Sequence, residues 1–134
     1  MTWKSTKAPS LADIEALALA ARDALPDAFR TPARAVAIRV VDFASDDMLD
    51  GLGIEDAFQL TGLYDGIPLT EKSTADQPQQ PDAIWLFRRA ILDEWVARGD
   101  VALDALVGHV LVHELAHHFG WSDDDIASVD EWWT

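Results

Sequence analysis

The amino-acid sequence predicts an α+β fold in which a small mixed or antiparallel sheet packs on one long helix. Short apolar runs, several rich in valine and isoleucine, occur between segments in which apolar residues recur at helical spacing. The chain has 134 residues, of which 49% are hydrophobic, and this is enough for one compact domain with a buried core. We therefore expect residues 10–134 to form a single domain, preceded by a disordered segment over residues 1–9.

The first half of the chain is expected to contain two helices and two strands. Apolar residues at helical spacing predict a helix over residues 11–25, with Ser10 as its N-cap. The valine- and isoleucine-rich residues 33–43 predict a strand. An acidic segment over residues 45–52, which begins with a serine cap, predicts a short helix, and residues 58–64 predict a second strand.

The second half of the chain is expected to contain the third strand and the longest helix. Several prolines in residues 68–82 predict a loop, and the short apolar run 83–87 predicts a strand. A helix over residues 90–98 should end at Gly99, and an apolar helix over residues 101–119 should follow it. We expect the strand at 83–87, which precedes these helices, to form the edge of a cleft, where an extended peptide could add as a further strand.

The last third of the chain carries the motif HExxHxxGxxD, which begins at His113. His113 and His117 are four residues apart, so both imidazoles lie on one face of a helix and can reach one metal ion. Glu114 lies beside the first histidine, where its carboxylate can take a proton from water. Gly120 is expected to end the helix through a left-handed backbone, and this reversal can bring Asp123 back as a third ligand. The pattern predicts a catalytic zinc site with one open position.

More than one carboxylate in the sequence could serve as the third metal ligand. Asp123 is the first choice because its spacing matches the extended motif. Asp124 and Asp125 are the nearest alternatives, and Glu131 would serve if the ligand came from the following helix. An aspartate at this position also suits the first turn of a helix that Ser122 caps, whether or not a metal is bound.

Three further polar side chains have alternative interpretations. His118 points about 100° away from His117 around the helix, so it should hydrogen-bond a neighbouring group or solvent rather than the metal. His109 lies one turn before His113, and its distance along the helix axis from His117 argues against a shared metal. Tyr64 could donate a hydrogen bond to a developing oxyanion or contact the substrate, or it could simply pack beside a strand.

Three blocks of sequence resemble those of a known family. The first block is the motif itself, HELAHHFGWSDDD. Residues 60–73, LTGLYDGIPLTEKS, resemble a segment of the form GLYxGxPLTxRS, and residues 81–89, PDAIWLFRR, resemble a strand of the form PDxIxLFRR. The blocks cover about residues 58–126 and follow the order found in the small bacterial zincin-like metallopeptidases, a minimal single-domain family that this chain resembles.

The resemblance implies a minimal zincin-like domain and a metal-dependent peptidase site, with Zn²⁺ as the cofactor. It implies no particular substrate. Two positions depart from the family pattern: Lys72 stands where arginine is usual, and Trp85 is bulky for its place in the strand. Both departures are minor.

The composition of the chain limits its partners and its compartment. The net charge is −14 and the sequence pI is about 4.3, so the protein should repel nucleic-acid phosphate and anionic membrane surfaces. We therefore expect a peptide or protein substrate, with no nucleic acid and no membrane as partner. The sequence has no cysteine, which excludes disulfides and thiolate ligands. It also shows no apolar signal segment, which predicts a cytoplasmic location.

Three classes of function can be compared on these observations. The first is a zinc-dependent peptidase in which Glu114 activates water and then protonates the leaving amine. The second is a non-catalytic zinc-binding module that recruits a protein partner through a strand edge. The glutamate favours the enzyme, because metal binding alone does not need it. The third is a metal-dependent nuclease with the motif HxxxHxxGxxH, which lacks the glutamate, uses a third histidine and fits poorly with a charge of −14.

Overall fold

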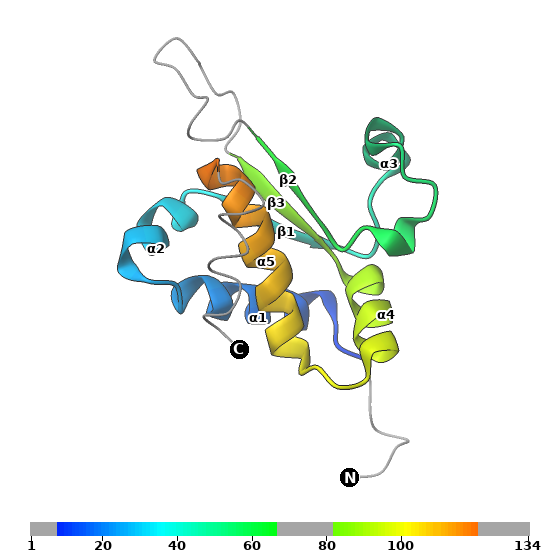
Figure 1. Cartoon of the computed structure of the whole chain (residues 1–134), viewed down its shortest axis with the longest axis horizontal. Coiled ribbons are helices and arrows are strands. Elements are labelled where there is room, and N and C mark those ends of the chain that lie inside the picture. The colour runs from blue at the N-terminus through cyan, green and yellow to red at the C-terminus, as the bar shows by residue number, and fades with distance from the viewer. Residues whose placement is uncertain (1–7, 67–81, 121–134) are drawn as a thin grey trace.

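The computed structural model describes residues 8–66 and 82–120 of the chain. The expected disorder at residues 1–9, the loop at 68–82 and the helix after Ser122 fall wholly or mostly outside these residues. The described part is an α+β fold, as the sequence predicts (Figure 1). In chain order its elements are α1 (Leu11–Asp23), α2 (Asp27–Arg34), β1 (Ala37–Val41), α3 (Asp46–Leu52), the 3₁₀ helix η2 (Ala57–Gln59), β2 (Gly62–Asp65), β3 (Ala83–Phe87), α4 (Arg88–Arg98) and α5 (Leu103–Phe119).

β3 is the central strand of a mixed three-stranded sheet with the order β1-β3-β2. β1 pairs with β3 in parallel, with Ala37 opposite Ala83, and β2 pairs with β3 antiparallel, with Gly62 opposite Leu86. The expectation that residues 83–87 form the edge of the cleft is therefore wrong, because β2 is the edge strand that packs beside α5. The uninterrupted apolar run of β3 is what a strand covered on both faces requires.

The side chains of β3 divide the interior into two apolar clusters. Ile84 and Leu86 are fully buried on the face that α1 and α5 cover, where they join Ile14 of α1 and Leu111 of α5. Phe87 points to the opposite face and packs with side chains of α3 and α4. The larger cluster, between the sheet and the helices α1 and α5, holds α5 against the sheet.

α5 is apolar around most of its circumference because other elements surround it. It packs against α1, β2, β3 and α4, and its buried residues run from Leu106 to His118. This burial accounts for the apolar segment that precedes the histidines in the sequence. Within residues 8–66 and 82–120, no helix is long and apolar enough to cross a membrane.

The helix caps expected from the sequence are present, although α1 ends at Asp23 rather than at residue 25 and α5 begins at Leu103 rather than at residue 101. The Ser10 side chain accepts a hydrogen bond from the Asp13 N–H at 3.1 Å, while the Asp13 carboxylate accepts one from the Ser10 N–H at 2.8 Å. Ser45 caps α3 in a similar way, through the N–H three residues further on. Gly99 and Gly120 have φ angles of 74° and 77°, the left-handed backbone with which helices commonly end.

The sequence did not reveal α2. Its eight residues include Pro32 and few apolar side chains, so neither propensity nor periodicity indicates a helix. Tertiary contacts hold it instead, since the Phe29 ring lies 5.5 Å from the Phe119 ring at the end of α5, and Ala33 is buried. The strand expected from residue 33 therefore begins only at residue 37.

For two other elements, β2 and α4, a hydrogen bond accounts for a boundary that differs from the expected one. The Asp56 side chain accepts a hydrogen bond from the Phe58 N–H at 3.0 Å and caps η2, so β2 begins at Gly62 rather than at residue 58. α4 begins directly after β3, because the Arg89 N–H donates to the Asp42 carbonyl at 3.1 Å and turns the chain there. The first of these hydrogen bonds is local and shortens β2, whereas the second is a tertiary contact and lengthens α4 relative to the sequence-based expectation.

Candidate metal centre

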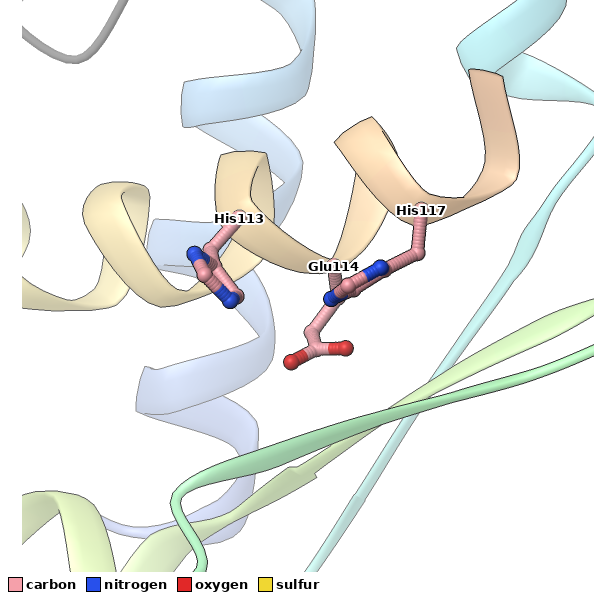
Figure 2. Close-up of side chains that lie close together, drawn as sticks. All are labelled: His113, Glu114 and His117. Atoms are coloured by element: carbon pink, nitrogen blue, oxygen red, sulfur yellow. The ribbon is translucent and has the colours of Figure 1, made fainter. Parts of the chain in front are cut away.

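Three half-buried side chains project from one side of α5. They are His113, Glu114 and His117, and Figure 2 shows the Glu114 carboxyl group directed toward the strands. One nitrogen of each histidine and one carboxylate oxygen all lie within 4.8 Å of one another. The histidine ring centroids are 5.2 Å apart, with the ring planes at 81°. The i, i+4 spacing thus brings the expected residues together on one face of the helix.

The donor atoms of this group suit a zinc ion. Two imidazole nitrogens on a tetrahedral zinc ion, each at about 2.0–2.1 Å from it, are roughly 3.3 Å apart. Nitrogens that already lie within 4.8 Å can reach that separation through small side-chain rotations. Imidazole and carboxylate donors without thiolate are also typical of catalytic zinc sites. His113 and His117 are therefore the residues that would hold the ion.

The environment of Glu114 changes its acidity. Burial raises the pKa of Glu114, whereas the nearby His117 and a hydrogen bond from the backbone N–H of Tyr64 lower it, and the net direction is upward. A carboxyl group with a raised pKa is better matched to accepting and returning a proton near neutral pH. The hydrogen bond also ties this side chain to β2.

Gly62 allows β2 to approach α5 beside Glu114. A Cβ atom at residue 62 would lie 2.7 Å from Cγ1 of Val110 and 3.2 Å from Cγ of Glu114. Only a glycine fits at such a distance without displacing its neighbours. The sequence analysis missed this residue, although a glycine inside a strand often marks a close approach of another element.

A family model described as a zincin-like metallopeptidase matches residues 33–133, which is more than half of the chain. The chain belongs to this family. The matched range includes the whole sheet and α5, whereas α1, which packs along α5, precedes it. No functionally curated protein matches the chain. Membership of the zincin-like family implies a metal, typically zinc, and agrees with the group of ligands on α5.

In this zincin-like protein, the backbone and the side chain of Tyr64 contact different residues. Its N–H reaches Glu114, but its hydroxyl donates a hydrogen bond to Oδ2 of Asp82 at 2.7 Å and lies 3.1 Å from Nδ1 of His118. Burial and the hydrogen bond to the Asp82 carboxylate both raise the pKa of Tyr64 above its ordinary value. A role for Tyr64 as oxyanion donor or substrate contact stays a prediction.

His118 is buried, and its Nδ1 lies 2.9 Å from Oδ2 of Asp82. The expectation that His118 interacts with a neighbouring group is therefore confirmed. Asp82 was missed, because the sequence places it at the end of an expected loop. The available signal was a charged residue directly before an uninterrupted apolar strand, where its side chain becomes buried beside that strand.

Of the remaining candidates, the structure describes only His109. His109 lies on α5, but within the described residues it is not part of the group that could share one ion. Asp123, the expected third ligand, lies outside the described residues. The same holds for the alternative ligands Asp124, Asp125 and Glu131.

Proposed function

We propose that this protein is a zinc-dependent peptidase in which His113 and His117 bind the metal and Glu114 is the general base. The observation that carries this proposal is the grouping of the three side chains within 4.8 Å, on a half-buried face next to an edge strand. The family match supports the same class of reaction. Two ligands from the protein do not complete a catalytic zinc site, and we propose Asp123 as the third.

Glu114 performs the proton transfers in this proposal. When bound, zinc supplies a Lewis acid that acidifies water and polarises the scissile carbonyl. The Glu114 carboxylate accepts a proton from the attacking water and returns it to the leaving amine. Burial raises the pKa of Glu114, which suits both halves of this task.

The outer edge of β2 is the surface on which we expect an extended peptide to bind. The Phe87 N–H donates to the Thr61 carbonyl at 2.9 Å, so in the antiparallel register the peptide groups of Gly62 and Tyr64 face away from β3. The Tyr64 N–H meets Glu114, which places this edge next to the general base. A peptide substrate would add to β2 as a further strand, with its scissile bond near the histidines.

The test is Glu114→Gln, which keeps the shape of the side chain but removes its basicity. This variant should retain zinc and lose hydrolysis of casein or a peptide library by about 100-fold or more, the contribution typical of general acid–base catalysis. Glu15→Gln is the matched control, because Glu15 is exposed on α1 and should leave activity unchanged. Full activity in Glu114→Gln would contradict the proposed role.

A second candidate is a zinc-binding module without catalytic activity, which the exposed position of β2 at the sheet edge would also suit. The two candidates differ in one measurable respect. The enzyme turns over peptides in the zinc-loaded state, whereas the module binds zinc and a protein partner but cleaves nothing. Zinc binding without cleavage of any peptide in a broad library would therefore favour the module.

A further inference from the structure

We propose that Tyr64, Asp82 and His118 form a tether that positions the last turn of α5, and with it His117, against the sheet. None of the three belongs to the group of potential ligands on α5. The inference rests on the proposed metal site, since it assigns to the tether the positioning of a metal ligand. The tether is also expected to keep the last turn of α5 ordered when no metal is bound.

The tether joins three elements through one carboxylate oxygen. Tyr64 lies on β2, Asp82 directly precedes β3, and His118 lies on α5. Oδ2 of Asp82 is 2.7 Å from the Tyr64 hydroxyl and 2.9 Å from Nδ1 of His118. Asp82 and His118 are the buried polar or charged residues of the described part of the chain, so these contacts lie in the interior.

The distances indicate where the hydrogens lie. A carboxylate oxygen attracts donors, so the separation of 2.9 Å assigns a hydrogen to Nδ1 of His118. The Tyr64 hydroxyl donates to the same oxygen. The hydroxyl oxygen and Nδ1 of His118 are 3.1 Å apart, so all three polar atoms lie next to one another. Because both donors converge on Asp82, the carboxylate holds β2 and α5 together at this point. A buried carboxylate is stable only with such partners.

His118 attaches the last turn of α5 to the sheet side of the molecule. Helix C-termini leave carbonyl groups without helical partners, and α5 ends where Gly120 adopts a left-handed backbone. His117 lies in this last turn, while His118 points about 100° away from it around the helix. When His118 is held on the sheet side, the rotation of the turn is fixed, and His117 is directed toward the metal site.

Tyr64 links the tether to the general base as well. Its side chain hydrogen-bonds Asp82, and its backbone N–H hydrogen-bonds Glu114. The His118 ring also packs against the Tyr64 ring, with centroids 5.6 Å apart. Movement of the Tyr64 side chain would therefore be transmitted to the segment of β2 that contacts Glu114. The tether therefore also supports the segment of β2 that lies beside Glu114.

The experiment compares local order and zinc affinity in substituted proteins. His118→Phe keeps an aromatic ring but removes the hydrogen bond, and Asp82→Ala removes the shared acceptor. Each should raise the zinc dissociation constant, measured with the metal alone against a chelator, by about 10-fold, the lower end of what supporting residues contribute. In the metal-free protein, the His117 amide should exchange with solvent faster, while the Leu111 amide in the middle of α5 should change little.

Two milder substitutions separate positioning from general stability. Asp82→Asn keeps an oxygen acceptor and should recover most of the zinc affinity that Asp82→Ala loses. Tyr64→Phe removes one hydroxyl but leaves Asp82 and His118 paired, so its effect should be smaller than that of His118→Phe. Both keep the packing volume, so they carry the test if Asp82→Ala or His118→Phe does not fold.

Ile91→Ala is the control for a general loss of stability. Ile91 is fully buried on α4 and is not one of the three residues that the polar contacts of the tether join. The Ile91→Ala substitution should lower the free energy of unfolding. The zinc affinity, and the exchange rate of the His117 amide relative to that of the Leu111 amide, should stay as in wild type. If the tether substitutions behave like Ile91→Ala in both measurements, the inference is wrong. Failure of the wild type to bind zinc would instead overturn the proposed function, and amide exchange would still decide the tether.

Discussion

Replacement of Gly62 by alanine should destabilise the protein and disturb Glu114, although alanine loses less conformational entropy on folding than glycine does. The new Cβ atom would lie 2.7 Å from Cγ1 of Val110 and 3.2 Å from Cγ of Glu114. Real Cβ atoms essentially never approach another atom closer than 3.0 Å, so something must shift. Val110 is buried on a helix that packs against both α1 and the sheet, which leaves β2 as the element that has to move.

Two opposing effects set the size of this change. Alanine reduces the freedom of the unfolded chain, which stabilises a protein by about 0.4–1 kcal/mol. Overpacking of a well-packed interior costs about 1–3 kcal/mol. The free energy of unfolding of Gly62→Ala should therefore fall by about 1–2 kcal/mol. The same contact also displaces Glu114, so kcat/KM of the folded variant should fall by about 10–100-fold.

Urea unfolding of the metal-free protein measures the stability change. Val110→Ala removes the Cγ1 atom that meets the new Cβ, so the double variant should show a favourable coupling of about 0.5–3 kcal/mol. Gly51→Ala is the control: its Cβ would meet nothing within 4 Å, and in the helix α3 it should raise stability by up to about 1 kcal/mol. Wild-type stability in Gly62→Ala, together with no coupling to Val110→Ala, would refute the close approach of β2 and α5.

The remaining predictions concern the metal and the single tyrosine. The purified protein should bind about one zinc ion per chain, and metal analysis should find little in the His113→Ala, His117→Ala double variant. Asp123→Ala should weaken zinc affinity by at least about 10–100-fold, whereas normal affinity there and a loss in Glu131→Ala would move the third ligand to the last helix. Tyr64 is the only tyrosine, so alkaline titration by absorbance reports its phenol alone, and its midpoint should lie above the ordinary value and fall on unfolding. Since folding raises this pKa, the phenol stabilises the folded state below about pH 10, and this contribution should be lost as the pH rises further.

The parts of the site that depend on nearby residues could be predicted from the sequence. The spacing of His113 and His117 places both on one face of any helix. Glu114 lies three residues before His117, so its side chain is a neighbour of His117 on the helix surface. The capping box at Ser10 and the left-handed end at Gly120 likewise involve residues within one turn of each other. These features need no knowledge of the rest of the fold, and the structure confirms the caps and the grouping of the three side chains.

Only the tertiary structure decided the order of the sheet and the contacts that surround the three side chains. Tyr64 and His118 are 54 residues apart in the chain and meet because β2 packs beside the end of α5. The need for glycine at residue 62 depends on where Val110 and Glu114 of another element lie. Local propensity and periodicity identify strands and helices, but they fit several strand orders equally well. The order is selected by pairing and packing between elements, and these depend on the relative positions of residues far apart in the sequence.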